Sequence, residues 1–137
     1  MTYFWLNQRS EDSGAYRDEE GEVYHYRDAV AGSQKLSESD WFIYYMPGEY
    51  VLFGAGRIGT IETKEEFNQT SYHAKIEQYR PFDPHISARD IKENISFLRG
   101  RTGLSGVPQN SIYEIDRDDY LTILRAAGEA DLILDEA

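Results

Sequence analysis

Apolar residues are densest between residues 40 and 61, where two hydrophobic runs flank a turn. Residues 41–46 form an unbroken aromatic and β-branched run, and a second run covers residues 50–53. Pro47 and Gly48 between them carry the strongest turn signal in the chain. Because β-branched and aromatic residues favour strands, this stretch predicts a β-hairpin at the centre of the fold.

Three other segments show strand patterns. Residues 3–6 and 23–26 are short aromatic runs, and residues 71–79 alternate apolar and polar positions, as in a half-buried strand. We expect a charged connector at residues 62–70, and we expect the prolines that begin at Pro81 to end the third strand. Short strands separated by turn signals favour a β-barrel over a parallel α/β sheet.

Two helices are predicted in the last third of the chain. The first covers residues 87–100, and the second runs from an N-cap at Asp116 to Gly128, with an alternating edge strand at residues 110–115 between them. The residues that recur at helical spacing, and are therefore expected to face the core, are Ile91, Ile95, Leu98, Tyr120, Ile123 and Leu124.

The length and composition are typical of one compact domain. The chain has 137 residues and no cysteine, so its core has to form without disulfides. We expect an α+β domain over residues 1–130, in which helices flank a small mixed β-barrel, followed by an acidic C-terminal tail at residues 131–137. No apolar run approaches the ~20 residues that span a bilayer, and the N-terminus lacks signal-peptide features. The sequence therefore predicts a soluble, cytoplasmic protein without a membrane partner.

The net charge of -11 argues against non-specific binding to nucleic acid, because the field of the protein repels phosphate. Only four of the 14 basic residues are lysines. An acidic, lysine-poor composition without cysteine resembles that of proteins from a high-salt cytoplasm, and it predicts a halophilic source. Concentrated salt would screen the repulsion to within a few ångströms.

One apparent cofactor motif is predicted to be structural. Gly54, Gly56 and Gly59 match the G-x-G-x-x-G pattern of dinucleotide sites. That site needs a helix to begin at the motif, so that the N-terminus of the helix meets a pyrophosphate. Residues 60–63 instead continue the strand pattern, and the sequence therefore predicts no dinucleotide site.

Motifs for metal binding and catalysis are also missing from the sequence. His25, His73 and His85 have no partners at metal-ligand spacing, and no serine lies in a nucleophile elbow. The sequence therefore predicts no metal, no cofactor and no catalytic residues, so a binding protein is expected rather than an enzyme. One alternative is a small nucleotide-processing enzyme on the same barrel, with His25 or His73 as general base.

The aromatic content is high for a chain of this length, with 11 Tyr, 6 Phe and 2 Trp. Filling the core of a small barrel accounts for most of these residues, and a protein-interaction domain with only core aromatics is a second alternative. Six aromatic residues differ in lying on predicted strands beside polar groups, a combination that can stack a flat ring and read its edge: Trp5, Tyr24, Tyr26, Trp41, Tyr44 and Tyr45.

Four segments carry the patterns of a known family. They are Y-x-D-x-x-G-x-x-Y-H-Y at residues 16–26, S-D-W-F-I-Y-Y at 39–45, F-G-A-G-R-I-G at 53–59 and Y-H-A-K-I-x-x-Y-R-P-F at 72–82. With these segments the chain resembles the PUA-like superfamily. It is most similar to the EVE and YTH-type modules at the N-termini of modification-dependent restriction endonucleases of the HNH and McrB kinds.

The resemblance implies a module that flips a modified base out of DNA, with RNA as the alternative, and holds the base in an aromatic cage. It also implies a restriction or defence system with a nuclease effector as partner, either as a further domain or as a subunit. Strand alternation lets only one of Tyr44 and Tyr45 face the cage, and Tyr45 is nearer the turn. Carried over to this sequence, the base-binding residues are Trp5, Asn7, Tyr24, His25, Tyr26, Trp41 and Tyr45, and the phosphate-binding residues are Arg9, Arg17 and Arg57.

Overall fold

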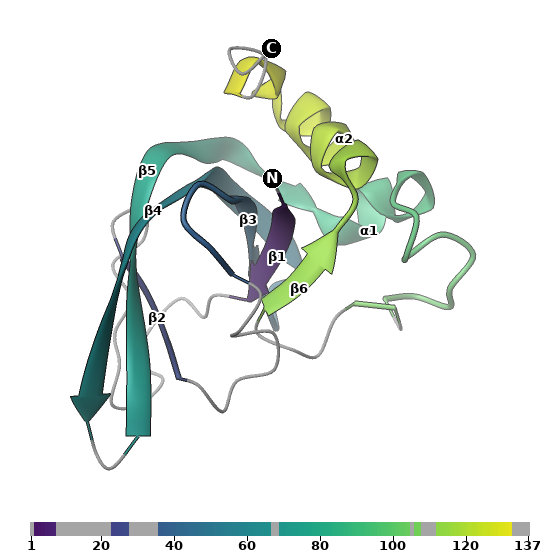
Figure 1. Ribbon diagram of the computed structural model, residues 1–137. Helices are drawn as coiled ribbons and strands as arrows, with labels where there is room; N and C mark the ends of the chain where they lie inside the picture. Colours follow the sequence, from purple (N-terminus) through teal and green to yellow (C-terminus); the bar gives the residue numbers. More distant parts are fainter. Residues whose placement is uncertain are drawn as a thin grey trace.

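A computed structural model of the protein describes residues 2–7, 23–27, 36–66, 69–104, 106–107 and 112–132. Within these residues, six strands form one sheet in the order β2-β5-β4-β3-β1-β6 (Figure 1). The strands are β1 (Tyr3–Asn7), β2 (Val23–Arg27), β3 (Trp41–Met46), β4 (Val51–Glu66), β5 (Gln69–Ser87) and β6 (Ile112–Ile115). The helices are α1 (Ala88–Ile91) and α2 (Arg117–Ala127), with short 3-10 helices η1 (Lys92–Asn94) and η2 (Ala130–Leu132).

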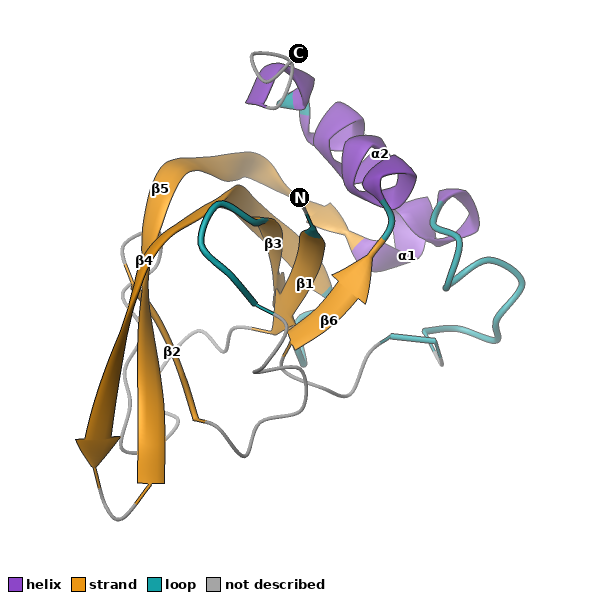
Figure 2. Cartoon of the chain, in the orientation of Figure 1, coloured by secondary structure: helices purple, strands orange, loops and turns teal. Residues whose placement is uncertain are grey.

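The sheet is mixed because β1 and β3 run parallel, whereas the other described strand pairs are antiparallel. The helices gather on one side of this sheet (Figure 2). In the described part of the chain the edge strands β2 and β6 do not pair with each other, so main-chain hydrogen bonds do not close the sheet. The predicted α+β class is confirmed, and the barrel is an open, curled sheet.

The predicted central hairpin is confirmed as β3, a turn at residues 47–50 and the first part of β4. β3 lies between β4 and β1, and five of its six residues are buried. Burial on both faces explains why its sequence is an unbroken apolar run instead of an alternating one.

β4 and β5 are longer than the sequence predicted. The charged connector expected at residues 62–70 is mostly strand, since the pairing continues from Glu62↔His73 to Glu66↔Gln69. The two strands form an arm that extends away from the helices (Figure 1). The polar composition of this segment suggested a loop. Main-chain pairing between the two strands nevertheless holds it as a strand.

β5 also continues through Pro81 and Pro84, which the sequence predicted to end it. Pro81 lies opposite Gly54, beside a register shift between Leu52 and Gly54. A bulge tolerates a residue that has no N–H to donate, so proline is compatible with the strand at this position.

The first predicted helix, at residues 87–100, is wrong in its length. Ser87 makes no capping hydrogen bond, η1 ends at Asn94, and Ile95 is extended with φ −107° and ψ 124°. The Ser96 amide donates to Asp119 of α2 at 2.9 Å, so a tertiary bond replaces the next helical turn. The three apolar residues expected to face the core are nevertheless buried: Ile91, Ile95 and Leu98.

The second predicted helix is confirmed as α2, which ends at Gly128 in the left-handed region (φ 75°). The chain stays packed beyond it, because Leu132 is buried and Arg80 Nη1 lies 3.1 Å from Asp131 and 3.0 Å from Glu129. Residues 133–137 of the predicted tail lie outside the described residues.

Apolar side chains cover both faces of the sheet. The helix-side cluster lies between the sheet and the helices and includes Trp5, Trp41, Ile43, Tyr45, Tyr120 and Leu124. The inner cluster lies on the curled face and includes Phe4, Leu6, Tyr24, Tyr26, Phe42, Tyr44 and Ile58. Successive residues of β1 and β3 alternate between the two clusters, as the two-residue period of a strand requires.

The glycines of the G-x-G-x-x-G match lie inside β4, and all three are sites of close approach, since a Cβ atom at Gly59 would lie 2.9 Å from the side chain of Glu77. A Cβ atom at Gly54 would lie 2.4 Å from the hydroxyl oxygen of Tyr79, and one at Gly56 would lie 3.1 Å from the ring of Phe42. The strand continues through residues 60–63, as the sequence predicted. These glycines therefore allow dense packing of the sheet.

Tyr120 attaches α2 to the sheet. Its buried hydroxyl donates to the main-chain oxygen of Phe42 at 3.1 Å, and the oxygen of Gly56 lies 3.5 Å away. Its ring centroid lies 5.0 Å from that of Tyr3. Burial raises the pKa of Tyr120 well above its ordinary value, with a smaller contribution from Tyr3.

Tyr120→Phe should lower the free energy of unfolding by about 1–2 kcal/mol, because a buried acceptor loses its donor. Urea denaturation of the variant and the wild type measures the difference. Tyr50→Phe is the matched control, since Tyr50 is exposed and should change stability little. Equal stability of the two variants would show that the Tyr120 hydroxyl does not anchor the helix.

Candidate nucleic-acid interface

Asn7, the last residue of β1, joins the two apolar clusters at one end of the sheet. Trp5 Nε1 donates to Asn7 Oδ1 at 3.2 Å, and the Tyr24 hydroxyl donates to the main-chain oxygen of Asn7 at 3.4 Å. Trp5 belongs to the helix-side cluster and Tyr24 to the inner cluster. The amide of Asn7 is thus oriented by an aromatic N–H at a place where both clusters meet.

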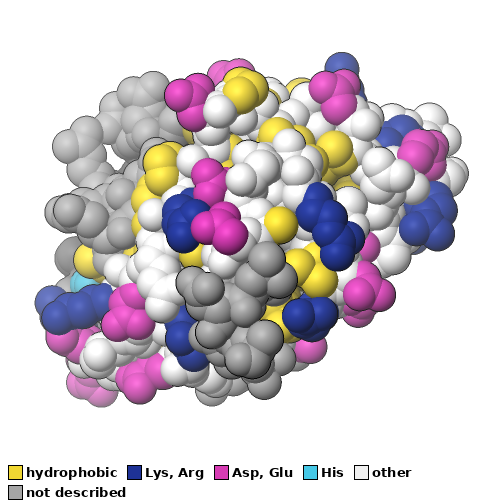
Figure 3. All heavy atoms as spheres, turned by 90° about the horizontal axis from the view of Figure 1, so that it is seen from above, with side chains coloured by type: hydrophobic (Ala, Val, Ile, Leu, Met, Phe, Trp, Pro, Cys, Tyr) yellow, Lys and Arg dark blue, Asp and Glu magenta, His cyan; other side chains and the backbone are white. Residues whose placement is uncertain are grey.

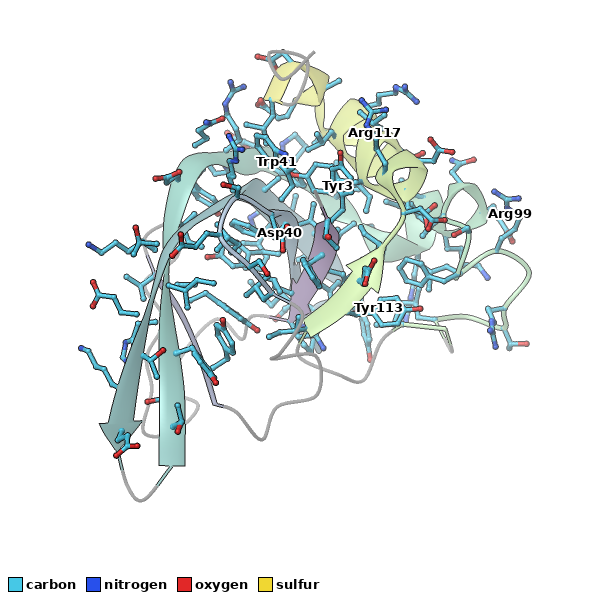
Figure 4. All side chains as sticks on the ribbon, in the orientation of Figure 1. Tyr3, Asp40, Trp41, Arg99, Tyr113 and Arg117 are labelled. Carbon is cyan, nitrogen blue, oxygen red and sulfur yellow. The ribbon has the colours of Figure 1, made fainter. Side chains whose placement is uncertain are left out.

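Further aromatic rings pack around Trp5. The centroid of Trp5 lies 4.8 Å from that of Tyr45 and 5.4 Å from that of Phe97, and Phe97 lies 5.3 Å from Tyr113. Figure 4 shows Tyr113 on β6, where the register places it opposite Trp5. We call this group the Asn7 cluster; its members are Trp5, Asn7, Tyr24, Tyr45, Phe97 and Tyr113.

The parallel pairing of β1 and β3 explains why these side chains meet. Parallel strands end at the same edge of a sheet, and Asn7 pairs in register with Tyr45. Tyr44 and Tyr45 belong to opposite clusters, as strand alternation predicted, and of the two only Tyr45 lies on the side of Trp5.

Exposure changes across the Asn7 cluster. Trp5 is 0% exposed and Tyr45 2%, whereas Asn7, Phe97 and Tyr113 are half-buried. The cluster therefore has a buried aromatic interior and a rim that reaches solvent.

Not all of the predicted base-binding residues come together. Trp41 starts β3, about 13 Å from Tyr45 at a rise of ~3.3 Å per residue, and its ring lies 5.0 Å from the Arg57 guanidinium. Arg57 Nε also donates to the main-chain oxygen of Ser39 at 3.3 Å. Trp41 and the predicted phosphate ligand Arg57 thus form a separate pair at the other end of β3.

Tyr26 lies in the inner cluster, 5.0 Å from Tyr72 in a stacked arrangement. Burial and, secondarily, Tyr72 raise the pKa of Tyr26 to about 12, so its hydroxyl is protonated at neutral pH. Arg9, Arg17 and the side chain of His25 lie outside the described part of the structure.

The sequence prediction missed Phe97 and Tyr113. Phe97 was passed over because it falls off the helical face formed by Ile91, Ile95 and Leu98, but the chain is not helical at that point. Tyr113 was assigned only to an alternating edge strand. The sequence could have pointed to Tyr113, because it lies on a predicted edge strand, where an aromatic side chain can reach solvent.

The segment that carries Phe97 is held in place from two sides. Ser96 donates to Asp119 through its amide at 2.9 Å and through its hydroxyl at 2.5 Å. The carboxylate of Glu93 accepts a hydrogen bond from the Gly100 amide, and the main-chain oxygen of Glu93 accepts one from Arg99 Nε, both at 3.1 Å. These bonds fix the backbone on which Phe97 contacts Trp5 and Tyr113.

Basic residues accompany this segment. Arg99 and Arg101 are exposed, and Lys92 donates to the main-chain oxygen of Arg101. Figure 4 shows Arg99 on the outer side of the segment that follows α1. On the face seen in Figure 3, in contrast, acidic and basic side chains are interspersed.

Among the described residues, no group of three or more His, Cys, Asp or Glu side chains is placed to hold a metal ion. Within the same residues, no helix combines the length and the hydropathy needed to cross a membrane.

No protein-family model matches the chain. No curated protein matches it either. The fold, however, is similar to that of solved structures, one of which is the N-terminal domain of an McrB protein, the kind of module that the sequence resembles.

Solved structures with this fold include the N-terminal domain of Staphylothermus marinus McrB, with a TM-score of 0.65 and 10% identity, covering 90% of this chain and 93% of that one. A mutant of the ZmASCH protein from Zymomonas mobilis has a TM-score of 0.63 at 11% identity, covering 91% of this chain and 96% of that one. Rpa0253 from Rhodopseudomonas palustris has a TM-score of 0.63 at 10% identity, with coverages of 93% and 94%. At these identities the similarity establishes the fold alone.

Asp119→Ala should lower the free energy of unfolding by about 1–3 kcal/mol more than Asp118→Ala, because only Asp119 binds Ser96. Both variants remove a negative charge from the first turn of α2, so the helix-dipole contribution cancels in the comparison. Urea denaturation measures stability, and amide hydrogen exchange over residues 92–101 reports on the segment. Unchanged exchange in the Asp119 variant would show that other contacts hold Phe97 in place.

Proposed function

We propose that this protein is a nucleic-acid-binding module that recognises a modified, flipped base in DNA through the Asn7 cluster. The observation that carries the proposal is the convergence of an oriented amide with buried aromatic rings at one partly exposed end of the sheet. Four predicted base-binding residues take part: Trp5, Asn7, Tyr24 and Tyr45. The PUA-like fold, shared with the N-terminal domain of an McrB protein, supports the proposal.

The chemistry of the cluster suits a nucleobase. Aromatic faces stack any base at ~1–3 kcal/mol each, which offsets the few kcal/mol that flipping costs. The Asn7 amide combines a donor and an acceptor in one plane, the combination that reads a base edge. A methyl group in an apolar pocket adds discrimination of roughly 10- to 200-fold.

The exposure pattern indicates how a base would enter. Trp5 and Tyr45 are covered, whereas Phe97 and Tyr113 are half-buried at the rim. In this proposal a base enters from solvent when Phe97 or Tyr113 turns away from Trp5. Rotation of a ring at the rim is compatible with the fixed backbone that Asp119 and Glu93 provide.

Phosphate contacts in this proposal come from arginine. Arg9, Arg17 and Arg57 remain candidates from the sequence, and the structure adds the exposed Arg99 and Arg101 beside Phe97. With a net charge of -11 and few such contacts, affinity should depend weakly on salt, with a slope near −0.9 per phosphate contact.

The wider role that we propose is recognition of modified DNA for a restriction or defence system in the cytoplasm. A nuclease effector, as a further domain or a separate subunit, would then act on the bound DNA. The module itself would read the base without catalysis.

A panel of short fluorescent duplexes tests the proposal directly. The duplexes carry 5-methylcytosine, 5-hydroxymethylcytosine, N6-methyladenine, phosphorothioate or no modification, with matching RNA, at moderate and high salt. We expect tenfold or stronger preference for one modified duplex by fluorescence anisotropy. Equal or absent binding throughout the DNA and RNA panels would refute the proposal and favour the nucleotide-enzyme or interaction-domain alternatives.

Asn7→Asp should lower affinity for the preferred duplex at least about tenfold while leaving the fold intact. The carboxylate still accepts the hydrogen bond from Trp5, but it has no N–H to donate and repels phosphate. Trp5→Ala is less informative, because removing a fully buried Trp costs about 3–5 kcal/mol of stability. Asn94→Asp adds the same charge at an exposed position as the control; equal loss in both variants would make the effect one of net charge.

A further inference from the structure

Tyr50 stands apart from the other aromatic residues. It is 42% exposed and is the one large hydrophobic side chain among the described residues that is exposed to this degree. It ends the turn between β3 and β4, directly before Val51. An exposed ring in a chain whose other described Phe, Tyr and Trp rings are half-buried or buried needs a separate explanation.

The backbone of Tyr50 is held in an unusual conformation. Its φ is 60°, in the left-handed region that bulky residues rarely adopt. Its amide donates to Met46 at 3.0 Å, and its carbonyl oxygen accepts from the Ala88 amide at 2.9 Å. With both main-chain groups bonded, the ring is presented to solvent from a fixed support, and such strained positions concentrate at functional sites.

Arg89 accompanies this ring. Its guanidinium carbon lies 5.1 Å from the centroid of Tyr50, and Arg89 forms no ion pair among the described residues. A guanidinium that stacks on a ring keeps its N–H donors in its own plane, where they can bind a phosphate. The pair therefore combines a stacking face with an anion-binding group.

The pair lies beside the Asn7 cluster. Tyr45 immediately precedes Met46, the residue whose carbonyl holds Tyr50, and Tyr45 packs against Trp5 at 4.8 Å. The pKa of Tyr45 is raised overall, mainly by burial and secondarily by Tyr50, and Arg89 offsets part of this rise. These contributions agree with a position of Tyr50 and Arg89 close to Tyr45. Neither Tyr50 nor Arg89 belongs to the interior of the cluster, so both can contact a different part of a bound strand.

We propose that Tyr50 and Arg89 bind the nucleotide next to the recognised base: its base stacks on Tyr50 and its phosphate binds Arg89. This inference rests on the proposed function and adds a second, sequence-independent contact to it. Stacking accepts every base, so the pair increases affinity without contributing to discrimination of the modification.

The test compares three probes that carry the modification preferred by the wild type. They are the free nucleoside, a single-stranded trinucleotide with the modified base in the middle, and the same trinucleotide with abasic flanking positions. Tyr50→Asn removes the ring but tolerates the left-handed backbone. It should lose at least about fivefold in affinity for the trinucleotide and nothing for the nucleoside or the abasic probe.

Arg89→Gln should weaken binding of both trinucleotides and reduce the salt slope by about 1, with no effect on the nucleoside. Tyr50→Phe should bind like the wild type, and Arg125→Gln, an exposed arginine on α2, controls for charge. Melting temperatures check that each variant is folded.

The two hypotheses fail differently. If the wild type prefers one modified probe and Tyr50→Asn keeps its full affinity for the trinucleotide, the inference is wrong and the proposed function stands. If Tyr50→Asn weakens nucleoside binding equally, Tyr50 belongs to the base site, which also overturns the inference. If the wild type shows no preference for any modification, the proposed function itself fails.

Discussion

The burial of β1 and β3 on both faces is the constraint on which the rest of the structure depends. A strand with two apolar faces needs a cover on each side. Here α2 covers one side, attached through the Tyr120 hydroxyl, and on the other side the sheet curls until Tyr24 of β2 reaches the main chain of Asn7. The glycines of β4 contribute to the same end, because Gly54 and Gly56 let rings pack directly on the backbone. Helix placement and sheet curvature therefore follow from one property of the two central strands.

The same constraint determines where polar chemistry can occur. Inside the sheet, alternate residues of β1 and β3 enter two apolar clusters, so a polar side chain is tolerated only where a strand ends. Asn7 is such a position, and its amide is paired with the indole of Trp5. Because β1 and β3 are parallel, their ends coincide, and Tyr45 and the turn that carries Tyr50 lie at the edge where Asn7 lies.

The sequence predicted those parts of the fold that depend on apolar burial. The central hairpin, the edge strand β6 and α2 follow from runs of buried residues such as those around Tyr44 and Ile123. It failed where main-chain or tertiary bonds decide the structure. The arm of β4 and β5 is polar and held by pairing, and the helix expected after Ser87 is interrupted because Asp119 binds Ser96. At the candidate site, strand alternation predicted that Tyr44 and Tyr45 face opposite ways, and the two residues do lie in different clusters. Phe97 could not be predicted, since its position depends on that Asp119 contact.

Residues of the buried interior and residues of the rim differ in how freely they can be substituted without loss of the fold. Trp5 and Tyr45 are core residues and also members of the proposed base site, so substitutions there affect stability first. Phe97, Tyr113 and Tyr50 lie at the rim or in a turn and contribute less to the core. Under the proposed function, the interior of the fold can therefore be kept while changes at the rim alter which base or neighbouring nucleotide is accepted. The low identity of 10–11% to solved structures that share the fold is consistent with a framework kept by burial pattern and not by particular residues.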